Sequence, residues 1–250
     1  MNQGGKIVCE NYGRVTSLAL DPIEKKPLRR FYPGTNILSV GSYGCNMDCG
    51  YCQNCTIARA DSTSVEWETI SPEALVTLAE GYRPQGNIGL AFTYNEPLIG
   101  YEYVLDCARL AKVRGLKIVL VTNGMIEPKR WARLLPYVDA ANIDLKAFSQ
   151  EGYRVLGGDL DTVKATIAQA QGRIHLELTT LIVPGFNDDD ENLREETAWI
   201  ASVSSQIPLH LSRFFPRHRM KAASATPPET MRRLEKVARE NLTYVYLGNL

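Results

Sequence analysis

Short runs of β-branched and apolar residues alternate along the chain with longer stretches in which apolar residues recur at helical spacing. The first pattern is typical of buried strands and the second of amphipathic helices. Strands that alternate with helices pair in parallel through right-handed crossovers, so the order predicts an α/β fold. The predicted strands are 37–43, 88–93, 117–121, 140–146, 174–183, 208–214 and 243–247. One helix is predicted to begin at Ser71-Pro72, and the others are 97–114, 127–136, 161–171, 190–202 and 228–240.

The alternation begins at residue 37 and continues without a break in composition. Six main strand–helix units in this length favour a partial (β/α)6 TIM-like barrel over a closed eightfold one, and an open doubly wound sheet is the alternative. We therefore predict one domain over residues 37–250. A short, turn-rich N-terminal extension, residues 1–36, precedes it.

Charge and hydropathy exclude several kinds of partner. The 250 residues include 28 Lys and Arg and 28 Asp and Glu, so the formal net charge is zero and no nucleic-acid partner is expected. No apolar run reaches the roughly 18 residues of a transmembrane helix, so no membrane partner is expected. The first residues lack the apolar core of a secretory signal, which favours a cytoplasmic location. We also expect a monomer.

Four of the six cysteines lie close together, at Cys45, Cys49, Cys52 and Cys55. Such clustering indicates metal binding rather than a disulfide framework in a chain of cytosolic character. Three closely spaced thiolates can hold one face of an iron–sulfur cube and leave one iron open. Two alternatives use Cys55 as a fourth ligand: a zinc site and a closed four-cysteine [4Fe–4S] electron carrier.

Polar residues follow the later strands at their carboxyl ends, which is where barrel enzymes place their sites. The alternative for Glu96, just before Pro97, is that it complements a helix dipole. Asp144 and Lys146 share one strand face and could form a simple ion pair. The candidates are Asn95 and Glu96 after 88–93, Asn123 after 117–121, and Asp144 and Lys146 on 140–146.

The spacing Cys45-x3-Cys49-x2-Cys52, with Tyr51 before the last cysteine, resembles the signature of the radical S-adenosylmethionine (SAM) superfamily. Further segments resemble the radical SAM member of the AmmeMemoRadiSam group, a relative of the pyruvate formate-lyase activating enzymes. The likeness covers roughly residues 10–250, and its segments are 21–28, 52–54, 93–97, 142–146 and 208–214.

This resemblance implies a [4Fe–4S] cluster on Cys45, Cys49 and Cys52 whose open iron binds SAM. Reductive cleavage of SAM would give methionine and a 5′-deoxyadenosyl radical, which abstracts hydrogen from a substrate that the sequence does not identify. The implied partners are an external one-electron reductant of the flavodoxin or ferredoxin type and, as an open alternative, a protein substrate or operon partner. The residues implied to bind SAM are Tyr51, Asn95, Glu96, Asn123, Asp144 and Lys146.

The chain departs from the family pattern at two positions. Val121 stands where the activating enzymes carry an aspartate associated with a monovalent cation, so that cation site is not implied here. Cys55 stands where we expect an aromatic residue, and we interpret it as a neighbouring thiol. Two alternative functions remain: an activating enzyme for a glycyl-radical enzyme, and a non-catalytic iron–sulfur electron carrier or sensor.

Three further features have simpler interpretations. Asp188-Asp189-Asp190 is expected to cap a helix, and His210 is as well explained by a satisfied core position as by a site. From Arg213 to Arg239, eight Lys and Arg residues face only Glu229 and Glu235. This stretch is either solvated charge or a docking surface for an acidic partner.

Overall fold

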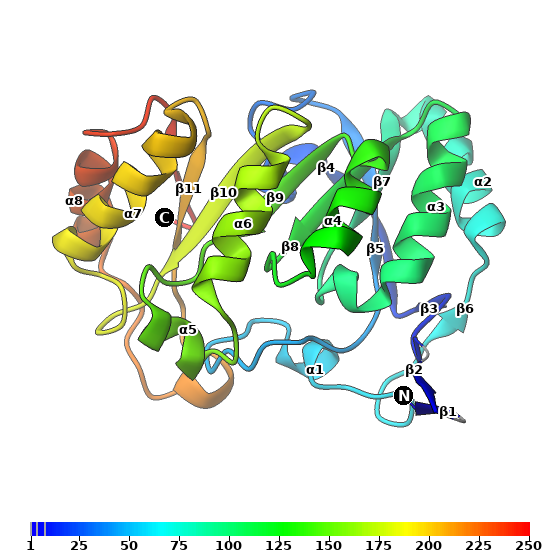
Figure 1. Ribbon diagram of the computed structural model, residues 1–250, viewed down its shortest axis with the longest axis horizontal. Helices are drawn as coiled ribbons and strands as arrows, with labels where there is room; N and C mark the ends of the chain where they lie inside the picture. The colour runs from blue at the N-terminus through cyan, green and yellow to red at the C-terminus, as the bar shows by residue number, and fades with distance from the viewer. Residues whose placement is uncertain (1, 4, 8) are drawn as a thin grey trace. The chain divides into compact units, whose positions relative to one another are not determined.

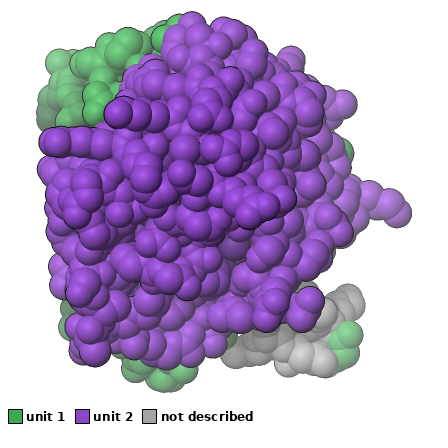
Figure 2. Space-filling model, turned by 90° about the vertical axis from the view of Figure 1, so that its left-hand side faces the viewer, with its two compact units in different colours: residues 1–46, 54–122, 132–141 green, residues 47–53, 123–131, 142–250 purple. Residues whose placement is uncertain are grey.

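The computed structural model describes residues 2–3, 5–7 and 9–250 (Figure 1). The chain forms two compact units, coloured green and purple in Figure 2. In the described part of the chain, no helix is both long enough and apolar enough to span a membrane. The first unit contains residues 1–46, 54–122 and 132–141, and the second contains 47–53, 123–131 and 142–250.

The sheet of the first unit has the strand order β4-β5-β7-β8. β5 and β8 both pair with β7 in parallel, as the alternation of strands and helices predicts. β4 pairs antiparallel with β5 and lies in the segment predicted only as turns. Its apolar residues do not alternate cleanly with burial, since Leu18 is exposed, so its pattern is weak. The bounds are β4 (Ser17–Pro22), β5 (Asn36–Gly41), β7 (Asn87–Phe92) and β8 (Lys117–Thr122).

Two small antiparallel pairs and several helices complete the first unit. α2 packs on α3 and β7. The predicted helix 97–114 begins as a 3-10 turn, η3, and Gly115 ends it with a φ of +67°, as a residue after a helix end often does. The bounds are β1 (Asn2–Gln3), β2 (Lys6–Ile7), β3 (Arg14–Val15), β6 (Glu68–Thr69), α1 (Cys55–Ala58), α2 (Pro72–Gly81), η3 (Pro97–Gly100) and α3 (Tyr101–Val113).

A buried apolar cluster packs strands of this unit against the segment that connects β4 with β5. It contains side chains of β5, β7 and β8 and the first residue of β9 (Ala140–Asp144). Burying these side chains away from water stabilises the unit beneath its strand ends. The cluster consists of Ile23, Leu28, Phe31, Ile37, Ala91, Val119 and Ala140.

The second unit contains the parallel strands β10, β11 and β12, in that order. α7 and α8 pack on each other, and α8 also contacts β11 and β12 (Figure 1). Asp189 accepts a hydrogen bond from the Asn192 amide at the start of α7, so the predicted cap is confirmed. The bounds are β10 (His175–Ile182), β11 (Leu209–Arg213), β12 (Val245–Gly248), α5 (Gln150–Val155), α6 (Leu160–Ala170), α7 (Asp190–Ser204) and α8 (Pro228–Ala238).

Two elements contain residues of both units: α4 (Pro128–Leu134) and β9 (Ala140–Asp144). β9 ends two residues earlier than predicted, so Lys146 lies beyond the strand. The predicted division into an N-terminal extension, residues 1–36, and a domain, residues 37–250, stays a prediction.

The cap of α2 gives a direct test of this local structure. The Ser71 hydroxyl accepts a hydrogen bond from the Ala74 amide at 3.2 Å, and Pro72 occupies the first helical position. Ser71→Ala should lower the free energy of unfolding by about 1 kcal/mol, because the amide loses its partner. Ser71→Asp keeps an acceptor and should stay close to wild type. Urea denaturation of the three proteins measures both effects, and equal stabilities would contradict the assignment.

Candidate functional site

The four clustered cysteines form no disulfide and are partly buried. Cys45 belongs to the first unit, and the chain then enters the second unit, which contains Cys49 and Cys52. The Cys52 amide donates to the Cys49 carbonyl at 3.2 Å, so the loop turns tightly between these two thiols. Cys55 is the first residue of α1, back in the first unit.

Asn95 holds the backbone that leads into the cysteine loop. Its amide oxygen accepts from the Ser42 amide at 3.0 Å, and its amide nitrogen donates to the Gly44 carbonyl at 3.1 Å. Both contacts lie within the three residues that precede Cys45 in the first unit. Asn95 therefore orients the start of this loop, a role that the sequence did not indicate.

Glu96 lies at the carboxyl end of β7 and is 3% exposed. Its Oε1 accepts from the Leu98 amide at 2.9 Å and from the Thr122 hydroxyl at 2.7 Å. The first bond caps η3, so the simple role at a helix start is confirmed. The second bond ties the carboxylate to the end of β8, which fixes its direction at the strand ends.

Asp144 and Lys146 form an ion pair, with 2.7 Å between Lys146 Nζ and Asp144 Oδ2. The Lys146 amide donates to the Tyr153 hydroxyl at 3.1 Å, so α5 holds this segment in place. Burial lowers the pKa of Lys146, but the Asp144 carboxylate, together with Cys49 and Tyr51, outweighs burial and raises it. Burial also raises the pKa of the Cys49 thiol, and Lys146 acts in the opposite direction. The charges of Asp144 and Lys146 and the Cys49 thiol therefore interact electrostatically within the second unit.

Tyr51 and Asn123 also belong to the second unit and are buried. Burial raises the pKa of Tyr51, and its hydroxyl has no hydrogen-bond partner among the described residues. Its ring lies 6.3 Å from that of Phe186, centroid to centroid. The side-chain oxygen of Asn123 accepts from the Met125 amide at 2.9 Å and so fixes the turn after β8.

These side chains fit an iron–sulfur cluster and a bound SAM. Reduced thiols are the ligands that such clusters require. The unpartnered Tyr51 hydroxyl and the Asp144–Lys146 pair supply polar groups suited to an amino acid and a nucleoside. Among the described residues, no three His, Cys, Asp or Glu side chains are already arranged to hold a metal ion. The assignment of ligands therefore rests on the spacing and the chemistry of the cysteines.

Comparison with known families identifies the class of protein. The model of the radical SAM superfamily matches residues 39–197, which include the cysteine loop and the strand ends just described. The chain belongs to the radical SAM superfamily. Members of this superfamily are generally enzymes, and they use a [4Fe–4S] cluster and SAM and need an external reductant.

Two relatives resemble the chain over most of its length. An uncharacterized protein of Methanocaldococcus jannaschii, MJ0808, is 38% identical over 253 residues, which is 100% of this chain and 74% of that protein. The pyruvate formate-lyase-activating enzyme of Clostridium pasteurianum is 22% identical over 216 residues, 80% of this chain and 88% of that enzyme. The likeness to activating enzymes is thereby confirmed, and the AmmeMemoRadiSam subfamily stays a prediction.

Solved structures confirm the predicted fold class, a partial (β/α) barrel. SuiB of Streptococcus suis bound to SAM superposes with a TM-score of 0.62 and 12% identity, covering 85% of this chain and 51% of SuiB. The methyltransferase TsrM of Kitasatospora setae, with cobalamin and a [4Fe–4S] cluster bound, gives a TM-score of 0.53 and 14% identity, covering 73% of this chain and 38% of TsrM.

The structure also shows a buried polar group that the sequence analysis missed. Asp21 accepts hydrogen bonds from Lys26 at 2.9 Å, Ser39 at 3.0 Å and the Tyr94 hydroxyl at 2.9 Å. Tyr94 immediately precedes Asn95 and has a φ of +73°. Asp21 therefore fixes the strained residue that leads into Asn95 and Glu96. The only signal in the sequence was that residues 21–28 are part of the family resemblance.

His210 occupies a satisfied position in the second unit, as one of its two interpretations predicted. Its Nε2 lies 2.6 Å from Oε2 of the fully buried Glu177, and the Nε2 of His175 lies 2.8 Å from the other carboxylate oxygen. The His210 ring also packs against Tyr246. A carboxylate between two imidazoles accounts for these residues without a ligand.

Proposed function

We propose that this chain is a radical SAM enzyme that cleaves SAM reductively. The resulting radical abstracts a hydrogen atom from a substrate. The observation that carries the proposal is the spacing Cys45-x3-Cys49-x2-Cys52, three partly buried cysteines inside the segment that matches the superfamily. When bound, the [4Fe–4S] cluster supplies the electron that splits SAM into methionine and a 5′-deoxyadenosyl radical.

The residues of this chain have distinct roles in the proposal. Cys45, Cys49 and Cys52 hold the cluster through their sulfur atoms and leave one iron for the amino and carboxylate groups of SAM. Lys146 suits a carboxylate. Glu96 and Asp144 suit an ammonium group and ribose hydroxyls, and the first is already fixed by Thr122. Tyr51, Asn95 and Asn123 complete the SAM-binding set in this proposal.

Anaerobic SAM cleavage tests this function. The chain is reconstituted with iron and sulfide, reduced with dithionite and given SAM, and 5′-deoxyadenosine is measured by chromatography. We expect 5′-deoxyadenosine from wild type and none above background from Cys49→Ala, because two thiolates cannot hold the cluster in its three-ligand form.

Cys55→Ala is the matched control. Under the proposal it keeps its cluster and its product, because Cys55 is not a ligand. Loss of the cluster in Cys55→Ala, together with no product and no change in the cluster's EPR signal when SAM is added to wild type, would contradict the proposal. That result would support the closed four-cysteine electron carrier.

The likeness to the Clostridium pasteurianum enzyme favours activation of a glycyl-radical enzyme as a second candidate. In that case the hydrogen comes from a backbone glycine of a protein partner. A glycyl radical signal in a pyruvate formate-lyase incubated with the reduced chain and SAM would support it. Production of 5′-deoxyadenosine without such a signal would leave the first function in place and remove this activity toward that lyase.

A further inference from the structure

The connection between β11 and α8 begins with a basic stretch that contains no acidic residue. From Arg213 to Pro228 the sequence contains Arg213, Arg217, Arg219 and Lys221 and no Asp or Glu. We call residues 213–221 the basic segment. It includes a short 3-10 turn, η5 (His218–Met220), in the orange part of the chain in Figure 1.

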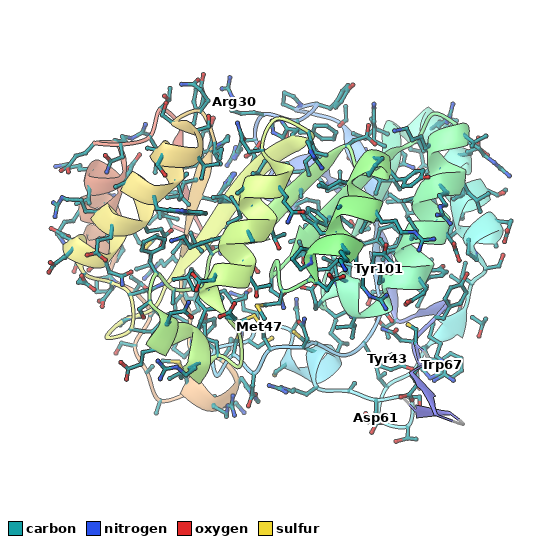
Figure 3. The ribbon with its side chains drawn as sticks, viewed as in Figure 1. Arg30, Tyr43, Met47, Asp61, Trp67 and Tyr101 are labelled. Atoms are coloured by element: carbon teal, nitrogen blue, oxygen red, sulfur yellow. The ribbon has the colours of Figure 1, made fainter. Side chains whose placement is uncertain are left out.

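The basic segment contacts the cysteine loop directly. The Arg219 amide donates to the Gly50 carbonyl at 3.0 Å, between Cys49 and Cys52 in the sequence. The Arg219 guanidinium pairs with both carboxylate oxygens of Asp48, at 2.7 and 3.2 Å. These contacts all lie within the second unit, whose first residue, Met47, is labelled in Figure 3. The basic segment is thus bonded to the loop that carries two of the proposed cluster ligands.

Two of its other cations are exposed to solvent. Arg217 and Lys221 are exposed, and the structure shows no ion pair for either within its described residues. Arg219 already neutralises Asp48, so the net charge of this surface is positive. Phe215 adds an apolar contact, because it is 37% exposed and the Arg213 guanidinium stacks on its ring at 4.8 Å. An exposed aromatic side chain and exposed cations within one short segment are typical of a protein-binding surface.

We propose that the basic segment is the docking surface for an acidic electron-donor protein. This inference rests on the proposed function, since it concerns how the cluster of the same site is reduced. In each encounter the donor is oxidised by one electron and the cluster is reduced by one electron. No bond is made or broken and no proton is transferred.

Position and charge together favour this occupant. Electron transfer is faster over a shorter distance, so a donor should bind close to the cluster. The basic segment is bonded to the loop between Cys49 and Cys52. Unpaired cations attract an acidic partner over about 10 Å at moderate salt and speed its association. The chain as a whole has zero net charge, so this attraction must come from a local patch.

A flavodoxin, an acidic flavoprotein, is the probe. Its dissociation constant for the reconstituted chain is measured by titration calorimetry over a range of salt concentrations, and its rate of cluster reduction by stopped-flow absorbance. The test variant is Arg217→Glu with Lys221→Glu. The control is Arg232→Glu with Lys236→Glu, which reverses two exposed cations of the same basic stretch on α8, away from η5 in the sequence. Arg219 is left intact because it holds the cysteine loop.

We expect the test variant to raise the dissociation constant for flavodoxin about tenfold or more at low salt and to flatten its salt dependence. The control should change it by less than about threefold. Reduction by dithionite and the resulting 5′-deoxyadenosine should be unchanged in both variants, since neither touches the site. Circular dichroism checks that both fold.

Three results would overturn the inference: flavodoxin that does not bind wild type, unchanged binding in the test variant, or equal weakening in the control. If wild type makes 5′-deoxyadenosine with dithionite, the proposed function stands whatever flavodoxin does. If it makes none with dithionite although flavodoxin binds the basic segment, the proposed function fails separately from the docking result.

Discussion

Asp21→Ala should lower the free energy of unfolding by about 3 kcal/mol, because it leaves a buried ammonium group without its counter-ion. The Lys26 side chain is only 3% exposed and lies 2.9 Å from the Asp21 carboxylate. Burial raises the pKa of Asp21, but its hydrogen bonds with Lys26 and Tyr94 outweigh burial and hold that pKa below its usual range. The carboxylate therefore stays ionised in the folded protein at neutral pH.

The sign of the pH dependence follows from that direction. A carboxyl whose pKa is lowered on folding contributes stability above its unfolded pKa, about 4, and loses it as the pH falls toward the folded pKa. The difference between wild type and Asp21→Ala should therefore be full at pH 7 and shrink in acid. Adding Lys26→Met to Asp21→Ala should recover part of the loss, because it removes the unpaired charge. A loss below about 1 kcal/mol in urea denaturation at pH 7 would show that the pair is not buried as described.

Glu196→Gln should stabilise the protein at high pH by as much as about 4 kcal/mol. Glu196 lies in α7, is 1% exposed and accepts a hydrogen bond from the Thr180 hydroxyl. Burial raises the pKa of Glu196 to about 8. The charged form is therefore disfavoured in the folded state, whereas the unfolded chain ionises near its usual pKa.

The raised pKa of Glu196 lowers the free energy of unfolding by an amount that depends on pH. This loss is absent below about pH 4.5, grows as the pH rises and is complete above about pH 8. The stability of wild type relative to Glu196→Gln should therefore fall between pH 5 and 8 and then level off, since glutamine never ionises. Glu195→Gln is the matched control, because Glu195 is the exposed neighbour on the same helix and should show no such trend. Parallel pH profiles for the two variants in chemical denaturation would refute the assignment.

The positions of most strands and helices could be read from the sequence, because long elements repeat their pattern many times. α7 and β10 were predicted within about two residues at each end. α5 was missed because six residues that include Gly152 and Val155 give no readable helical period. β4 was missed because its ladder with β5, rather than its own pattern, makes it a strand.

The residues of the candidate site could be proposed from the sequence for a different reason. The cysteine spacing and the Asp144-x-Lys146 motif are local, and the chemistry of thiols and charges belongs to the residue types. What these side chains contact was not readable. The bonds of Asn95 to Ser42 and Gly44 join residues far apart in the sequence, as does the bond of Arg219 to Asp48.

The sequence by itself thus determined the α/β class, the superfamily and the residues suited to a cluster and SAM, because each depends on local periodicity or spacing. Only the tertiary structure decided that Asp21, Lys26 and Tyr94 form one buried group and that Glu177 lies between two histidines. It also decided that the basic segment is bonded to the cysteine loop. Such pairings arise when folding brings distant residues together and burial forces each polar group to find a partner.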